Sequence, residues 1–392
     1  MRILQLSVAA MCVAAPLSGQ AITYASKDSV DGQPKSTAFV GLSIRFNAFV
    51  DFYGLQGSPT FAPIEIPTDG SGHEGARLAA DLRQTRLSLG GTNNGTPIGP
   101  IAGLLEMDFW GPNGTTVLRL RRAFVTARRL LIGQEWSSFS DLSSSPMTAD
   151  WDGPPSGHDV RVVMIQYRSP RTPAHTWSTR ISLEDPQVDL KYIDTTPVDS
   201  TLIDPSIALT YQRLPNLAAS LRMEQSWGHL ELAGLLLELR YRQDSTNQSA
   251  LGYGLALSGL VNVGARDQLY LQALAGRGVS RYVTGIGGAG IDAIVYNAVL
   301  DAVPVAGGFL AYEHYWTPSL YSTGVLGGIV VRNDLNPAYE DYFRGAYGSV
   351  NLFLTPAPRL NLGTEVVYGW RKDRFGQDGD ALRVYLITQY TL

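Results

Sequence analysis

Charged residues recur at every second position in two neighbouring stretches of the sequence, LLEMDFW and VLRLRRAFV. Glu106 and Asp108 alternate with apolar residues in the first stretch, and Arg119 and Arg121 do so in the second. Because successive side chains of a β-strand point to opposite faces, this spacing predicts two strands that each have a charged face and an apolar face. Guanidinium groups bind carboxylates through two parallel hydrogen bonds, so the arginine-bearing face is suited to attract anions.

Further arginines fall on the polar faces of other predicted strands. They are Arg45, Arg180, Arg222 and Arg383, with Arg83 or Arg86 as an additional member. In a narrow water-filled lumen such a set concentrates and guides anions, because low-dielectric walls focus the electric field. The alternative is that nearby acids neutralise the arginines in salt bridges, and the sequence alone leaves both interpretations open.

A long loop follows the next predicted strand. Residues 140–159 are rich in Ser, Pro, Gly and Asp, and the segment is too long for a hairpin turn. Its candidate residues are Asp141, Asp150, Asp152, His158 and Asp159. We expect this loop to cross in front of the charged strands, so that its acids lie opposite the arginines and the lumen is constricted.

The alternation that defines the charged strands runs through the rest of the chain. Apolar residues occupy every even position from Val40 to Phe52, and similar patterns recur as far as Leu392. A strand of this length matches one that is tilted through a bilayer and extends beyond it. Aromatic residues near the predicted strand ends fit the interfacial girdles of outer-membrane barrels.

The predicted fold is therefore all-β: a transmembrane antiparallel β-barrel with a pore-constricting loop. We count about seventeen candidate strands, and we expect 16 because single-chain bacterial barrels close with an even number. Short connections are predicted at 128–129, 264–267 and 355–358, and long ones at 54–75, 140–159, 185–204 and 278–303. A β-bulge near Arg83 and a slip of the alternation near Gly234 are also expected.

The chain divides into three predicted parts. Residues 1–21 have a minimal basic start, an apolar run and small residues before Ile22, which predicts a signal peptide. Residues 22–37 are polar and predict a flexible N-terminal lead. Residues 38–392 form the barrel domain. Cys12 lies within the signal peptide, so the mature chain is expected to have no disulfide or thiolate site.

The composition and the motifs of the chain argue against several functional classes. Removal of residues 1–21 leaves 30 basic and 35 acidic residues, a balance that does not suggest nucleic-acid binding. No two of the five histidines have metal-ligand spacing, and no Gly-x-Ser-x-Gly motif is present, so we expect no metal, no cofactor and no enzyme activity. A hydrolase whose Ser, His and Asp meet only in space is a minor alternative.

Several stretches together resemble the DcaP-like porins of Gram-negative outer membranes. The matching segments include DLRQTRLSL (81–89), GLLEMDFWG (103–111), LRLRRAFV (118–125), LIGQEWSSFSD (131–141), GGFLAYEHYWTPSLYS (307–322) and LRVYLITQYTL (382–392). Each fragment is weak alone, but their order makes the set fairly specific, and it covers most of the mature chain.

The resemblance implies a trimeric sixteen-stranded barrel in the outer membrane, with a loop after the fifth strand that narrows the pore. Its implied site residues are Arg83, Arg86, Arg119 and Arg121, which would select small anions such as dicarboxylates. Three features depart from the family pattern. Residues 22–37 are too short for the helical extension that some members carry, Tyr321 stands where an Arg is expected, and the chain ends in Leu392 instead of an aromatic residue.

We therefore predict a passive porin for small hydrophilic solutes with a modest preference for anions, surrounded by outer-membrane lipid and lipopolysaccharide. The second hypothesis is a structural or receptor barrel whose lumen is plugged and whose long loops bind a partner.

Overall fold

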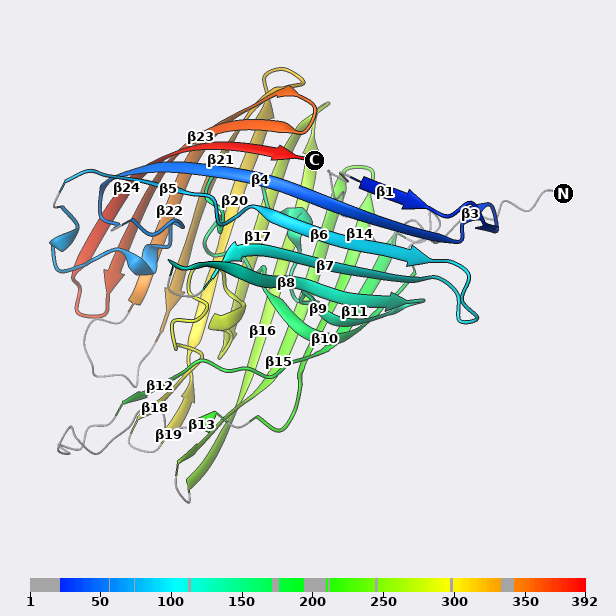
Figure 1. Cartoon of the computed structure of the whole chain (residues 1–392). Helices are drawn as coiled ribbons and strands as arrows, with labels where there is room; N and C mark the ends of the chain where they lie inside the picture. The colour runs from blue at the N-terminus through cyan, green and yellow to red at the C-terminus, as the bar shows by residue number, and fades with distance from the viewer. Residues whose placement is uncertain are drawn as a thin grey trace.

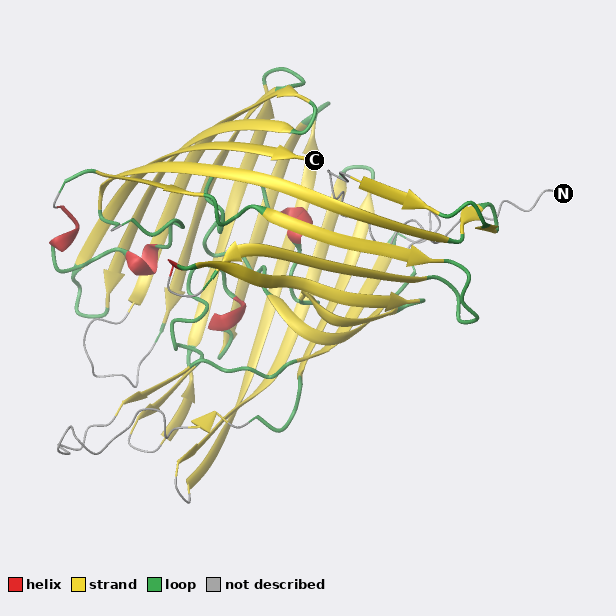
Figure 2. Cartoon of the chain, viewed as in Figure 1, coloured by secondary structure: helices red, strands yellow, loops and turns green. Residues whose placement is uncertain are grey.

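The computed structural model of the chain describes residues 22–55, 57–73, 75–111, 114–170, 176–193, 209–210, 212–243, 246–296, 299–332 and 342–392. The predicted signal peptide and Cys12 lie outside these residues. The described residues form one large antiparallel sheet that closes on itself, because β24 pairs with β4 and β4 pairs in turn with β5 and β6. Figures 1 and 2 show the resulting barrel, with several loops folded into its interior.

Sixteen strands make up the wall, as predicted. They are β4 (Ser36–Tyr53), β6 (Arg86–Asn93), β7 (Ile101–Trp110), β8 (Thr116–Ala127), β9 (Leu130–Trp136), β10 (Arg161–Arg168), β11 (Trp177–Glu184), β14 (Asn216–Gln225), β15 (Gly228–Gln243), β16 (Thr246–Val263), β17 (Asp267–Arg277), β20 (Pro304–Tyr315), β21 (Leu320–Val331), β22 (Tyr342–Ala357), β23 (Leu360–Asp373) and β24 (Asp378–Thr391). Two short strands extend members of this wall. β5 (Arg77–Asp81) continues the line of β6 along β4, and β13 (Leu209–Thr210) lies beside β15.

The alternation in β4 has the predicted phase. Ile44, Phe46 and Phe52 are exposed on the outside, whereas Arg45 and Asp51 are buried on the inside. A bilayer offers no water to an outward polar group, so an apolar outer face and a polar inner face are the stable arrangement.

The two expected irregularities have different outcomes. The wall is interrupted between Asp81 and Arg86, where β5 ends and β6 begins, which agrees with the irregularity expected near Arg83. The slip predicted near Gly234 is wrong, because β15 pairs without a break with both β14 and β16 through that position. Leu235 and Leu237 point inward and belong to a buried apolar cluster with Tyr282 and Ile286, which explains the dense run of leucines.

Residues 22–37, expected as a loose lead, contain strand structure. β1 (Ile22–Ala25) pairs with β4, and β2 (Ser29–Val30) and β3 (Gln33–Pro34) form a small hairpin. β24 pairs with β4 only as far as Ser43, and β1 takes up the next part of that edge, from Val40 to Thr37.

The connections fall into two classes, largely as expected. Short turns join β8 to β9, β16 to β17 and β22 to β23, the last at Pro358–Arg359, slightly later than predicted. The long loops at the opposite end carry the 3₁₀ helices η2 (Pro63–Glu65), η3 (Ser71–His73), η5 (Leu142–Ser144) and η7 (Ser280–Tyr282). Three outer strands, β12 (Leu190–Ile193), β18 (Ala293–Tyr296) and β19 (Val299–Ala302), form a separate small sheet. In outer-membrane barrels the long loops face the outside of the cell.

None of the helices in the described ranges has the length and apolar character required to span a membrane.

A buried ion pair joins the two strands that close the barrel. Arg383 on β24 donates from both Nε and Nη2 to the carboxylate of Asp51 on β4, with a distance of 2.8 Å from Nη2 to Oδ2. The two residues are 0% and 1% exposed. The Arg383 guanidinium also lies 4.2 Å from the centre of the Phe49 ring.

We predict that Arg383→Ala lowers the free energy of unfolding by about 3–5 kcal/mol, because it leaves the Asp51 carboxylate buried without its partner. Urea unfolding of the purified protein, followed by its electrophoretic heat shift, measures this loss. Arg266→Ala in an exposed turn is the control and should change little. Equal stability of the two variants would contradict a structural role for the ion pair.

Candidate functional site

A β-bulge in β8 brings three arginines to the inner face of the barrel. Arg122 pairs with Glu106 of β7 and Leu120 pairs with Met107, so Arg121 is an extra residue in β8. Two adjacent residues at such a bulge can point to the same side of a sheet. Arg121 therefore contacts the inward-facing Glu106, and Arg122 contacts the inward-facing Glu135.

Each of these arginines has an acidic partner on a neighbouring strand. Arg119 forms two hydrogen bonds with Asp108, of 3.0 Å from Nε and 2.7 Å from Nη2. Arg121 donates from Nε to Glu106 at 2.9 Å and from Nη1 to Asp108 at 3.0 Å. Arg122 holds Glu135 at 2.8 and 2.6 Å. The hypothesis that strand acids neutralise the arginines is thus correct for this part of the wall.

Trp151 of the long loop lies against three arginines, one of which, Arg121, also pairs with strand acids. The guanidinium carbons of Arg45, Arg86 and Arg121 lie 5.2, 4.1 and 5.0 Å from the centre of its ring. The ring face attracts cations, so the indole holds three like charges together that would otherwise repel one another. We call Arg45, Arg86, Arg119, Arg121, Arg122 and Arg161 the arginine cluster.

Three members of the arginine cluster have no acidic partner within the described residues: Arg45, Arg86 and Arg161. Arg45 donates to the side chains of Asn47 and Gln389 and to the carbonyl of Ala149. Nε of Arg86 and Nη1 of Arg161 are buried and make no hydrogen bond in the described part of the chain. Arg86 and Arg161 therefore retain donor groups that the described residues do not use, and none of the three arginines is neutralised by an ion pair in the described part of the chain.

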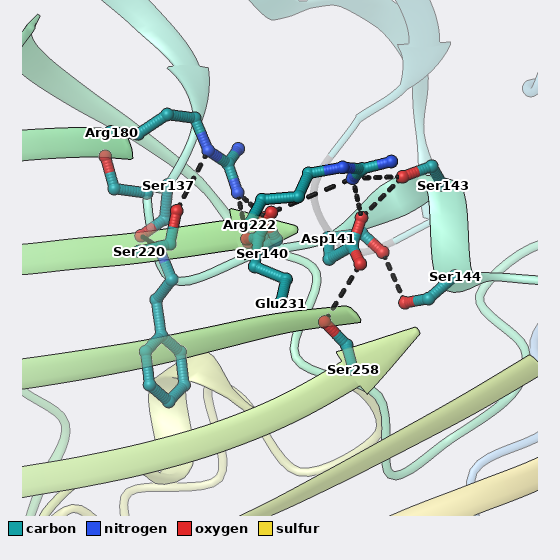
Figure 3. Close-up of polar contacts among 12 residues, drawn as sticks. Ser137, Ser140, Asp141, Ser143, Ser144, Arg180, Ser220, Arg222, Glu231 and Ser258 are labelled. Carbon is teal, nitrogen blue, oxygen red and sulfur yellow. Dashed lines mark hydrogen bonds and ion pairs between the residues drawn. The ribbon is translucent and has the colours of Figure 1, made fainter. Parts of the chain in front are cut away.

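The loop that carries Trp151 lies inside the barrel; we call residues 137–160 the inward loop. Near its start, Asp141 accepts hydrogen bonds from Arg222 at 3.0 Å, Ser143 at 2.6 Å and Ser258 at 2.9 Å, and it lies 2.8 Å from Nε2 of His229. Figure 3 shows Arg222, Ser143 and Ser258 converging on this carboxylate from three elements. These contacts fasten the loop to β14, β15 and β16.

Arg180 secures the same part of the loop. It donates from Nη2 to the carbonyl of Ser140 at 2.7 Å and from Nε to Ser220 at 3.1 Å, and it forms an ion pair with Glu231 (Figure 3). Arg180 and Arg222, predicted to guide anions, are therefore anchors of the inward loop. Their charges are neutralised by Glu231 and Asp141.

The rest of the inward loop reaches the opposite wall. Ser156 donates to the carbonyl of Gly308 on β20, and Asn351 on β22 donates to the carbonyl of Met147. Glu365 on β23 accepts from the backbone of Ala149 and Asp150. The loop thus contacts strands on both sides of the barrel.

The loop acids differ in their surroundings. Burial alone would raise the pKa of Asp141, but the hydrogen bond with His229 and the charge of Arg222 outweigh it and lower that pKa. Burial, together with the negative charges of Glu365 and Asp152, raises the pKa of Asp150 to about 8. His158 packs edge-on against Phe139 at 5.4 Å between ring centres, and burial lowers its pKa to about 4.

The remaining predicted residues lie in three different surroundings. Arg83 forms an ion pair with Asp81 and lies over Trp110, not over Trp151. Asp159 accepts a hydrogen bond from Ser145 within the inward loop. Asp152 lies where the charges of Arg161, Arg119 and Arg121 act on it. Within the described residues, no group of three or more His, Cys, Asp or Glu side chains could hold a metal ion.

Four residues of the site were missed from the sequence: Arg122, Glu135, Arg161 and Trp151. The adjacent arginines in LRLRRAF break the strict alternation, and that break was an available signal for the bulge at Arg121. Arg161 and Trp151 lie at a strand end and in a loop, where alternation gives no information about direction.

Comparison with known proteins settles the family. The family model described as DcaP outer membrane protein matches residues 12–392. The chain belongs to the DcaP outer membrane protein family. It is accordingly a protein of the bacterial outer membrane. No curated protein matches the chain in sequence.

Solved structures with the same fold include the DcaP family's own channel. The outer membrane channel DcaP of Acinetobacter baumannii aligns with a TM-score of 0.75 and 20% identity, covering 94% of this chain and 100% of that one. An anion-selective porin from Comamonas acidovorans gives 0.60 and 12%, covering 91% and 100%. OprB of Pseudomonas putida gives 0.54 and 10%, covering 91% and 94%. The DcaP family member described here therefore has the porin fold.

We predict that Asp141→Asn loosens the inward loop of this DcaP family member, because a neutral amide cannot form the ion pair with Arg222 or accept all the hydrogen bonds that the carboxylate accepts. Single-channel recording should show increased current noise and frequent brief closures. Asp31→Asn, an exposed aspartate of the N-terminal turn, is the matched control. A quiet trace from Asp141→Asn would show that the other anchors suffice.

Proposed function

We propose that the protein is a passive porin for small hydrophilic solutes that prefers anions, small dicarboxylates among them. The observation that supports this most directly is the arginine cluster. It gathers six arginines, Arg45, Arg86, Arg119, Arg121, Arg122 and Arg161, around four acids, Glu106, Asp108, Glu135 and Asp152. Two further acids, Asp150 and Glu365, act on Arg45. Because burial raises the pKa of Asp150 to about 8, the arginines outnumber the ionised acids at pH 7.

The mechanism is diffusion guided by this excess charge. A solute carboxylate that enters the lumen is attracted by the charges of Arg45, Arg86 and Arg161, which form no ion pair with an acid among the described residues. Guanidinium groups bind a carboxylate in a planar, two-point manner, and water-filled surroundings keep that binding weak enough for release. Arg119 and Arg122, paired with Asp108 and Glu135, contribute to the field mainly as dipoles.

The inward loop narrows the passage in this proposal. Its anchors on β14–β16 and its contacts with β20, β22 and β23 place Trp151 against the arginines. Glu365 lies on the side away from β8, so a transverse field would orient dipolar solutes as they pass, and Asp150 would add to this field as its carboxyl ionises at higher pH. We further propose that the protein assembles as a homotrimer, that residues 1–21 are its signal peptide and that residues 38–392 are its barrel domain.

Planar-bilayer recording tests the channel itself. Stepwise conductance with a reversal potential biased toward anions in a salt gradient is the expected result. Absence of conductance from folded protein would overturn the proposal and favour a plugged structural or receptor barrel.

Selectivity should depend on the arginines that have no acidic partner. We predict that replacing Arg86 and Arg161 by Gln shifts the reversal potential toward cations, because the cluster then loses its excess positive charge. The neutral pair Arg119→Gln with Asp108→Asn removes one charge of each sign and should leave selectivity nearly unchanged. Arg128→Gln at an exposed turn is a second control. The opposite ranking of the first two variants would refute this assignment.

Selectivity should also depend on pH through Asp150. Because the pKa of Asp150 is raised to about 8, its carboxyl is mostly neutral at pH 7 and becomes charged as pH rises past 8. We predict that anion preference falls between pH 7 and pH 9 in the wild type, and that Asp150→Asn flattens this change. An identical profile in the two proteins would mean that Asp150 does not titrate in this range.

A further inference from the structure

The inward loop meets the arginine cluster with a tight turn. The backbone N–H of Gly153 donates to the carbonyl of Asp150 at 3.3 Å, which closes a four-residue β-turn whose two central residues are Trp151 and Asp152. Thr148 holds the base of this turn, since its hydroxyl lies 2.7 Å from the carbonyl of Asp150 and 3.2 Å from that of Gly153. Trp151 and Asp152 therefore form the tip of the turn.

The base of the turn is fixed to its surroundings. Asp150 is 1% exposed, and its Oδ1 accepts hydrogen bonds from the backbone N–H of Phe61 at 3.2 Å and from the hydroxyl of Tyr385 at 3.3 Å. The carbonyl of Ala149 accepts a hydrogen bond of 2.6 Å from Nη2 of Arg45. The wall and the loop of residues 54–75 thus set the position of the tip.

The two residues of the tip meet the arginine cluster in different ways. The Trp151 ring is fixed against it, with its centre 4.1 Å from the guanidinium carbon of Arg86. Asp152 is exposed, and three members of the cluster act on its carboxylate through their charge: Arg161, Arg119 and Arg121. Among the described residues, however, this carboxylate accepts no hydrogen bond and forms no ion pair. An acid thus stands in the field of the arginines, and no direct bond holds it there.

The same arginines are the ones that attract a solute. The side chain of Arg119 is 35% exposed, so a solute carboxylate can reach it from the passage. Arg86 and Arg161 add charge that no ion pair neutralises within the described ranges, and each has a nitrogen without a hydrogen bond there. Asp152 presents to these arginines the same chemical group that a solute carboxylate presents.

A group tethered beside its binding partner acts at an effective concentration in the millimolar range, because it cannot diffuse away. Conduction also requires that binding be weak enough for the solute to leave. We propose that Asp152 is a tethered competitor of the solute carboxylate, which weakens the binding of small carboxylates to the arginine cluster and so shortens their stay in the passage. This inference rests on the porin function proposed above.

Single-channel recording in planar bilayers tests the proposal, with succinate as the probe. Succinate that binds in the passage interrupts the chloride current, so its binding is measured by the concentration that halves this current and by the length of each interruption. The variants are Asp152→Asn, which removes the charge, and Asp152→Glu, which keeps it. Glu65→Gln is the matched control, because Glu65 is an exposed acid of η2 and the arginine whose charge acts on it is Arg383, the partner of Asp51.

Asp152→Asn should lower the half-blocking concentration of succinate about three- to tenfold and lengthen each interruption, because one contact between a carboxylate and a guanidinium carries about this factor. Asp152→Glu should give a value close to that of the wild type, and Glu65→Gln should leave it unchanged. Absence of chloride current from the wild type would refute the porin function together with this inference. A conducting wild type separates the two, because the variants then test the competitor alone.

Three results from conducting channels would overturn the proposal. Equal half-blocking concentrations in Asp152→Asn and the wild type would show that Asp152 does not compete with succinate. An equal decrease in Asp152→Asn and Glu65→Gln would assign the effect to the general field of the acids in the passage. An Asp152→Glu channel that behaves like Asp152→Asn would show that the charge at this position is not the cause.

Discussion

In a bilayer no water can pair with an exposed strand edge, so the wall of this protein has to close on itself. It does so where the last strand, β24, meets the first long strand, β4. Closure fixes which side of every strand faces hydrocarbon and which faces the interior. Charge in the membrane-spanning part of the wall is consequently directed inward, and Arg383 and Asp51 illustrate the result, since they form an ion pair at the seam with almost no exposure.

The charges collected inside must then be satisfied by one another. Strand acids neutralise Arg119, Arg121 and Arg122, whereas the loop acid Asp141 and the strand acid Glu231 neutralise Arg222 and Arg180. The inward loop thus has two physical roles. Its first part is fastened through ion pairs, and its middle places an aromatic ring against Arg45 and Arg86. An aromatic ring stabilises these cations and leaves their formal charge intact.

Strand count, phase and loop classes could be predicted because they depend on a period of two that the sequence displays directly. β4 shows this plainly, since its even residues are apolar from Val40 to Phe52 and lie outside. The distinction between anchoring and free arginines could not be predicted. Arg180 and Arg86 have the same pattern in the sequence, yet one meets Glu231 and the other meets Trp151, through contacts set by loop geometry. The run of leucines near Gly234 led to the wrong prediction of a slip. The inward face of β15 is apolar there because loop residues such as Tyr282 cover it, and loop contacts of this kind cannot be derived from the alternation.

The bulge at Arg121 has a consequence for how such a wall can change over evolutionary time. In a regular strand, loss of a single residue reverses the direction of every side chain that follows, which would turn a charged face toward lipid. In β8 the extra residue already absorbs one such shift. Deletion of either Arg121 or Arg122 would restore unbroken alternation and keep Phe124 and Thr126 on their present face. The number of cations on this wall can therefore fall by one through a single codon deletion, a kind of mutation that would reverse the faces of a regular strand.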